Sequence, residues 1–272
     1  MRIIGISVLI AVVAVGGQPD ADDIYTMSNG KTCSREGSAV KPEVRVLNRL
    51  KNRFESPTVD DIDSDVSLAT LLAPGEDEKR FDSAKAARLV GFVVDVKVGG
   101  NETCNCKATD PIDRDTHIEL ALAPGAPPNQ RVIVEVTPRF RKQMREKEGD
   151  ARADWRTLTL QSHGNGGIKG KWVEITGWLL FDIEHTDAAE NTSPGNPKNW
   201  RATCWEIHPV TQISVLGGPP ANFVAVEPSA LRTLQQAHVM HVGRDKTRHD
   251  EIEARNKRNR DLFGPEETEP PK

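Results

Sequence analysis

The 272-residue sequence lacks the short motifs that mark several common enzyme classes. No G-x-S-x-G segment is present, which argues against a serine hydrolase, and neither a P-loop nor a dinucleotide-binding glycine fingerprint occurs. His238 and His241 stand three residues apart, but the glutamate of the zinc-binding His-Glu-x-x-His helix is missing. No motif therefore names a reaction, and we assign no catalytic residue.

An overall excess of basic charge is also missing. The chain has 36 Lys and Arg against 40 Asp and Glu, a formal net charge of -4, and only 5% aromatic residues. Nucleic-acid-binding proteins usually present a basic surface, so any such surface here must be local. With 37% hydrophobic and 28% charged residues, the composition indicates one moderate core with polar extensions.

The N-terminus has the pattern of a secretory signal. An apolar run from Ile3 to Val15 follows Arg2 and is too short to cross a bilayer comfortably. We predict a signal peptide over residues 1–17, with an uncleaved anchor or a buried strand as the alternative. The mature protein is then exported, periplasmic or secreted, and has no membrane span.

An even number of cysteines in an exported chain predicts disulfides. Cys104 and Cys106 are only two residues apart, so we do not expect them to pair with each other. A bridge from one of them to Cys33 or to Cys204 is expected, and the sequence leaves the choice open.

Residues 88–216 carry the period-two apolar alternation of β-strands. Five strands are predicted, at 88–98, 116–123, 131–137, 171–183 and 203–216. In the first strand we assign the buried face to Val90, Phe92, Val94, Val96 and Val98. Pro138 opens a basic helix between the third and fourth strands, which contains Arg139, Arg141, Lys142, Arg145 and Lys147.

This element order predicts the fold class. Three strands, a helix and two strands are the connectivity of the five-stranded Greek-key OB barrel, and an open antiparallel sheet is the alternative. The chain is therefore expected to be mainly β, with terminal extensions that are helical or disordered. Residues 18–87 are read as a linker followed by a short amphipathic helix between Val44 and Phe54, and residues 217–272 as a charged C-terminal tail.

Two long polar loops mark the expected binding site. OB barrels hold ligands across strands two and three, between the loops that join strands one to two and four to five. Here these loops are 99–115 and 184–202. Loops of this length are often functional, and a mobile surface is the alternative. The predicted ligand-binding residues lie in or beside these loops: Asn105, His117, Glu119, His185, Asn191, Trp200, Arg201 and His208.

The leading functional hypothesis is a binding module for single-stranded nucleic acid, an oligosaccharide or another envelope protein. An exposed Trp200 beside Arg201 would stack on a base or a sugar ring. The basic helix after Pro138 would add a path for an anionic polymer, although charged helix faces are most often simply solvated.

The alternative is a metal-dependent hydrolase of the phosphodiesterase or nuclease type. Asp115, Glu119 and Arg201 are the candidates for cation binding and for stabilising charge on a phosphate. Zinc ligands would come from the histidines and glutamates near the loops and from Cys104 and Cys106. Their spacing is not diagnostic, so we favour structural hydrogen bonds and assign neither a metal ligand nor a cofactor.

The position of the histidines adds one further expectation. His117 lies on the second predicted strand and His208 on the fifth. These strands are not neighbours in an OB sheet, so the two side chains need not converge.

Several stretches of this region carry a family resemblance: ETCNC (102–106), DTHIEL (115–120), GWLLFD (177–182) and NWRATCWEIHP (199–209). With these the chain resembles a group of exported bacterial proteins with an OB-like domain. The resemblance covers a little under half of the chain. It implies a shared domain and a bacterial origin, and it brings no mechanism with it.

Overall fold

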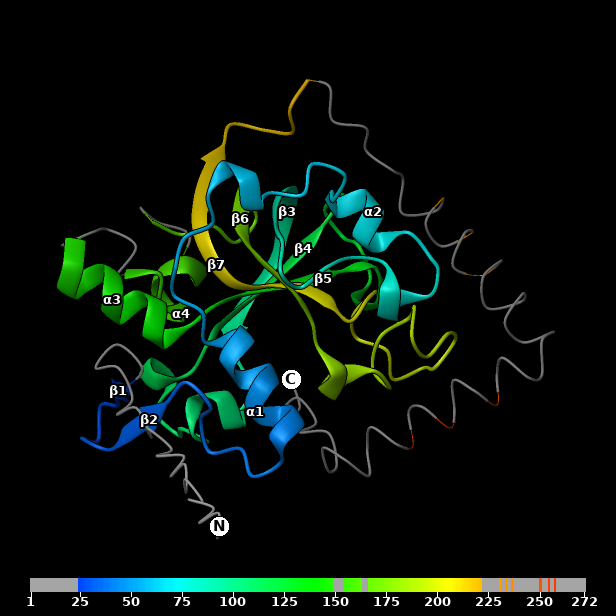
Figure 1. Cartoon of the computed structure of the whole chain (residues 1–272). Helices are drawn as coiled ribbons and strands as arrows, with labels where there is room; N and C mark the ends of the chain where they lie inside the picture. The colour runs from blue at the N-terminus through cyan, green and yellow to red at the C-terminus, as the bar shows by residue number, and fades with distance from the viewer. Residues whose placement is uncertain are drawn as a thin grey trace, which may run out of the picture.

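The computed structural model describes residues 24–148, 154–162 and 166–221, together with six isolated positions nearer the C-terminus. The predicted signal peptide and almost all of the C-terminal tail lie outside these ranges. The elements, shown in Figure 1, are β1 (Ile24–Thr26), β2 (Thr32–Ser34), α1 (Pro42–Lys51), η2 (Val59–Asp61), α2 (Leu68–Leu72), η3 (Asp77–Lys79), β3 (Ala86–Val98), η4 (Thr103–Asn105), η5 (Pro111–Asp113), β4 (Thr116–Ala121), η6 (Pro128–Gln130), β5 (Val132–Val136), α3 (Pro138–Glu148), α4 (Thr157–Gln161), β6 (Trp172–Phe181), η8 (Ile183–His185) and β7 (Trp205–Leu216).

Five strands close into a barrel of the OB type. Their order is β3–β4–β5–β7–β6, and β6 pairs with β3 to complete the circle. β5 and β7 run parallel through Val134 and Ile207, whereas the other four pairs are antiparallel. The predicted helix appears as α3, between the third and fourth barrel strands. The predicted fold class is confirmed, and the barrel is closed rather than an open sheet.

The first barrel strand changes its buried face part-way along. Leu89 and Val93 are fully buried, whereas Val90 and Phe92 are only partly buried. The pairing with β4 contains a β-bulge just after Val93, and a bulge shifts the alternation of side chains by one residue. The assignment of Val90 and Phe92 to the buried face is therefore wrong, because the sequence pattern does not reveal the bulge.

Short helices complete the core. Leu71 and Leu72 of α2 and Phe140 of α3 belong to the same hydrophobic cluster as the barrel interior. Gly91 of β3 lets α2 approach, because a Cβ atom there would lie 2.7 Å from a methyl carbon of Leu68. In Figure 1, α2 lies on one side of the barrel and α3 with α4 on another. Within the described ranges, no helix has the length and apolar character needed to cross a membrane.

The N-terminal region is tied to the barrel. The predicted amphipathic helix is confirmed as α1, but the preceding residues, which we read as linker, form the β1–β2 hairpin. A disulfide joins Cys33 of this hairpin to Cys106 in the loop after β3. This is one of the pairings that the sequence left open, and Cys104 and Cys204 are free and buried. The hairpin is therefore fixed to one of the two loops that border the predicted site.

Candidate binding site

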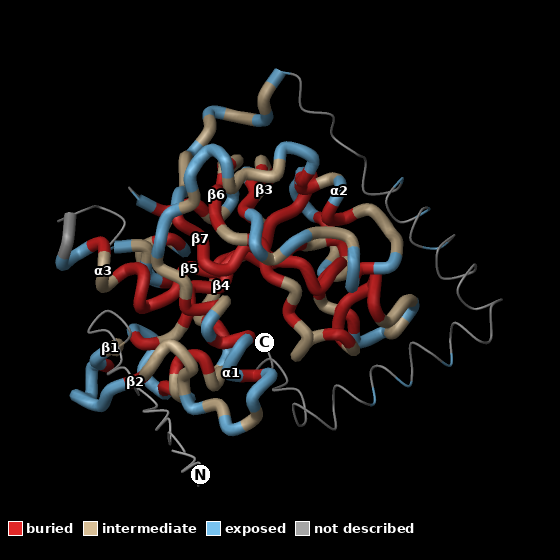
Figure 2. The backbone as a smooth tube through the Cα atoms, in the orientation of Figure 1, coloured by how far each residue is buried: buried red, intermediate tan, exposed pale blue. Residues whose placement is uncertain are grey.

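A cluster of charged side chains is buried on the outer face of β4, β5 and β7. It includes His117 and Glu119 on β4, Glu135 on β5, and Glu206 and His208 on β7, each at most 5% exposed. Barrel strands point alternate residues outward, so these side chains would face solvent if nothing covered them. The two long loops and α1 cover them, and Figure 2 shows the strands as mostly buried. Buried charges must find partners, which makes every contact in this cluster informative.

Glu135 connects the two histidines. Its Oε1 lies 2.7 Å from Nδ1 of His117, and its Oε2 lies 3.3 Å from Nδ1 of His208. The strand β5 lies between β4 and β7, so one carboxylate reaches both rings. The expectation that His117 and His208 need not converge thus overlooked Glu135. The sequence feature that could have identified Glu135 is its outward position on the third strand, where it pairs directly with His117.

Each of these histidines has one ring nitrogen without a hydrogen bond in the described part of the chain. Nδ1 of His208 also lies 3.1 Å from Oε1 of Glu206, so carboxylates hold Nδ1 of both rings. Within the described part of the chain, Nε2 of His117, Nε2 of His208 and Oδ1 of Asp115 are buried without a hydrogen-bond partner. Such atoms are uncommon in folded proteins and suggest a missing ligand, ion or water. The rings are oriented through Nδ1. Nε2 of His117 lies 3.9 Å from Oε1 of Glu119, and Nε2 of His208 is left for a further interaction.

The protonation states follow from the burial of the cluster. Burial and the charge of Glu135 raise the pKa of Asp115 to about 7. Burial opposes the charge on Glu135, but the hydrogen bond from His117 and the charge of His208 lower its pKa to about 2. Burial also opposes the charge on His208, yet its hydrogen bond to Glu206 and the nearby carboxylates raise its pKa to about 9. Perturbed pKa values of this kind are concentrated at functional sites.

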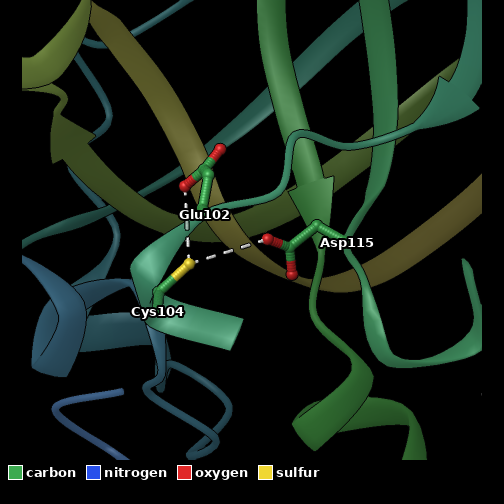
Figure 3. Close-up of side chains that lie close together, drawn as sticks. All are labelled: Glu102, Cys104 and Asp115. Carbon is green, nitrogen blue, oxygen red and sulfur yellow. Dashed lines mark hydrogen bonds between the residues drawn. The ribbon is translucent and has the colours of Figure 1, made fainter. Parts of the chain in front are cut away.

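The first long loop places a thiol against this cluster. Sγ of Cys104 lies 3.4 Å from Oε2 of Glu102 and 3.9 Å from Oδ2 of Asp115, as Figure 3 shows. Asn105, a predicted site residue, donates from Nδ2 to the same Asp115 oxygen at 2.6 Å. Burial and the two carboxylates raise the pKa of Cys104 well above its usual range, so the thiol stays protonated at neutral pH.

A lysine that we did not predict closes one side of the cluster. Nζ of Lys51 on α1 lies 2.6 Å from Glu102 and 2.9 Å from Asp182, and the side chain is only 1% exposed. Despite its burial, the charges of Asp182 and Glu102 raise its pKa well above the usual value. The sequence feature that could have identified Lys51 is its place on the apolar face of the amphipathic helix, one turn after Leu47.

Trp200 brings the second loop to the surface of the site. Its ring centroid lies 5.3 Å from that of His185 and 5.9 Å from that of His117, so it connects two predicted residues. Nζ of Lys97 lies 5.8 Å from the same ring centroid. Trp200 is partly exposed, which makes it the accessible aromatic edge of an otherwise covered cluster.

Two cations meet Glu119 near this aromatic edge. Lys97 and Arg131 bind its two carboxylate oxygens at 2.7 Å and 2.6 Å. Burial alone would raise the pKa of Glu119, but these cations lower it. Lys97 and Arg131 are partly exposed, whereas Glu119 is buried. The accessible charge beside Trp200 is therefore positive.

Arg201 and Asn191, two of the predicted ligand-binding residues, are buried. Arg201 is 1% exposed, and its Nη2 lies 2.8 Å from Glu206, so it is an internal counter-charge rather than a surface group. Asn191 is also buried, and its side chain donates to the backbone oxygen of Ala73 and to Asp77. Both residues lie in the second of the two predicted long loops, but the sequence pattern does not give the direction of their side chains.

The basic helix α3 is not a simple cationic surface. Arg139 and Arg141 are both buried. Arg141 donates to Thr116 and to three backbone oxygens, and Arg139 donates to the backbone oxygen of Cys33. These two arginines therefore stabilise the fold and do not contribute to the expected path for an anionic polymer along α3.

Fold and site together define an OB-type barrel with a covered, polar cluster on its outer face. The structure brings together Asn105, His117, Glu119, His185, Trp200, Arg201 and His208 and leaves Asn191 apart.

No protein-family model and no curated protein matches the chain. Among solved structures, a crystal structure of yeast Stn1 and Ten1 aligns with 92% of this chain and 93% of that chain, at 11% identity and a TM-score of 0.25. A likeness this low carries no weight, so the barrel class rests on the strand order alone.

Proposed function

We propose that the protein is an OB-type binding module that holds a short segment of single-stranded nucleic acid at Trp200. The observation that carries this proposal is a partly exposed indole at the ligand face of the barrel, with Nζ of Lys97 5.8 Å from its centroid. Bases of any sequence stack on aromatic rings, and lysine pairs with the neighbouring phosphate.

The charges limit the length of the bound segment. Lys97 and Arg131 are the partly exposed cations bound to Glu119, while Arg139 and Arg141 are buried. A contact with about two phosphates fits this arrangement, and a long phosphate track along α3 does not.

The hydrolase alternative requires an accessible Arg201, and the structure does not provide one. Arg201 is buried and paired with Glu206, so it is not available to stabilise charge on a phosphate at the surface. Asp115 and Glu119 remain, but Glu119 is occupied by Lys97 and Arg131. The geometry therefore favours binding over phosphodiester cleavage.

Export remains part of the proposal. The Cys33–Cys106 disulfide supports an oxidising compartment, where such bonds persist. The apolar N-terminal run and the resemblance to exported bacterial proteins point to the same location, and the run itself lies outside the described residues.

A binding titration tests the ligand class. Fluorescently labelled oligothymidylate is added to the full chain at low salt and followed by anisotropy, with unlabelled neutral and anionic oligosaccharides as competitors. Saturable binding of the oligonucleotide supports the proposal. Binding of the oligosaccharides alone would replace nucleic acid with a glycan, and no binding of either would refute the module as described.

A further inference from the structure

Asp115, Glu135 and His208 form a compact group of three potential metal ligands. One ligand atom from each lies within 4.8 Å of the others. Asp115 directly precedes β4, and the other two residues lie on β5 and β7; these three strands are adjacent in the barrel. None of the three is more than 4% exposed.

Unused polar atoms point to the same place. Oδ1 of Asp115 and Nε2 of His208 are both buried without a partner in the described part of the chain. The other nitrogen, Nδ1 of His208, lies 3.1 Å from Oε1 of Glu206 and 3.3 Å from Oε2 of Glu135. A histidine that ligates a metal typically donates its second ring N–H to a carboxylate, which is the role open to Glu206.

A second group, Glu102, Cys104 and Asp115, competes for the same ion. The two oxygens that face its thiol are already bound, since Lys51 lies 2.6 Å from the Glu102 oxygen and Asn105 donates to the Asp115 oxygen at 2.6 Å. In the group with His208, both oxygens of Glu135 face imidazole nitrogens, but Oδ1 of Asp115 and Nε2 of His208 have no hydrogen-bond partner. Two of its three residues thus offer an unused atom, so it is the better site.

We propose that Asp115, Glu135 and His208 bind one divalent transition-metal ion of the zinc class, beneath the loops that cover the barrel. Two carboxylates with one imidazole suit Zn²⁺ or a similar ion, and three protein ligands leave a fourth position for water. Glu206 orients His208, and Cys104 lies beside the ion without binding it. The site is independent of any ligand at Trp200.

Metal analysis of the full chain tests the stoichiometry. Protein is stripped with a chelator, dialysed, and titrated with Zn²⁺ by calorimetry. We expect one ion per chain, a loss of at least 100-fold in affinity in Asp115→Asn and His208→Gln, and unchanged affinity in the control Asp95→Asn, whose partner is Lys169. Absence of stoichiometric binding in the wild-type chain, or equal affinity in all three variants, would overturn the proposal.

X-ray absorption of the zinc-loaded wild-type protein identifies the ligands even if a variant fails to fold. Nitrogen and oxygen neighbours with imidazole scattering are expected. In the Co²⁺-substituted protein, the spectrum lacks a thiolate-to-metal charge-transfer band and is the same in Cys104→Ala. A sulfur neighbour, or a band that disappears in Cys104→Ala, would move the ion to the Glu102 group and refute the assignment.

Discussion

Oε1 of Glu135 on β5 lies 2.7 Å from Nδ1 of His117 on β4. The other oxygen of the same carboxylate lies 3.3 Å from Nδ1 of His208 on β7, so one side chain links three adjacent strands across the outer face of the barrel. Because both imidazoles depend on it, Glu135 is expected to be the residue of this face whose loss affects stability most.

Replacing Glu135 with Gln should destabilise the protein by about 3 kcal/mol, the order of magnitude seen when one partner of a buried ion pair is removed. The amide would place N–H donors against an imidazole that needs an acceptor. Urea unfolding, with a chelator present throughout, measures the change in the free energy of unfolding.

Glu174→Gln is the matched control for this variant. Glu174 lies on β6, is partly exposed and faces the exposed Arg88 at 3.9 Å. A surface pair of this kind contributes between 0 and about 1 kcal/mol. If both variants lose the same stability, Glu135 does not organise the cluster.

Stability should depend on pH through His185. Although burial opposes its charge, Asp182 raises the pKa of His185 to about 9, above the unfolded value of about 6.5. The protonated form is therefore favoured by folding, and its contribution is complete below pH 6.5 and is lost as the pH rises through 9. The wild type should lose more stability between pH 6.5 and 9 than His185→Gln. Parallel pH profiles for the two proteins would contradict this assignment.

Reduction of the Cys33–Cys106 disulfide should lower the melting temperature. The bond closes a loop of 73 residues, for which chain-entropy models give about 4 kcal/mol. A calorimetric scan with and without reductant measures the effect. The double variant Cys33→Ala/Cys106→Ala should melt at the temperature of the reduced wild type and should not respond to reductant.

Oligonucleotide binding should depend only weakly on salt. With about two phosphates neutralised, the logarithm of the association constant should fall with a slope of about −1.4 against the logarithm of salt concentration. Lys97→Ala should bring the slope to about −0.7. A steep slope, equal in both proteins, would show that the phosphates bind elsewhere.

The barrel was predictable because its strands have regular apolar alternation and its turns are marked by Gly and Pro. The bulge after Val93 was not, since a bulge adds one residue without a distinctive sequence, and it reversed the faces assigned to Val90 and Phe92.

The charged cluster lies on the strand face where the sequence analysis expects a ligand, and only part of its composition was predicted. Strand order indicated the face that holds His117 and His208, but Glu135, Lys51 and Asp115 gain their roles from neighbours distant in sequence. Whether Arg201 reaches solvent depends on its contact with Glu206, and a loop sequence does not encode that contact locally.

The most direct measurement compares two tryptophan variants in the oligothymidylate titration. Trp200→Leu removes the indole beside Lys97 and His185, whereas Trp178→Leu removes an indole on β6 that donates to the backbone oxygen of Glu55. Loss of one stacking contact weakens binding by about 1–3 kcal/mol, or roughly 5- to 150-fold. We predict this loss in Trp200→Leu alone. Equal affinity of both variants and the wild type would contradict a binding module centred on Trp200.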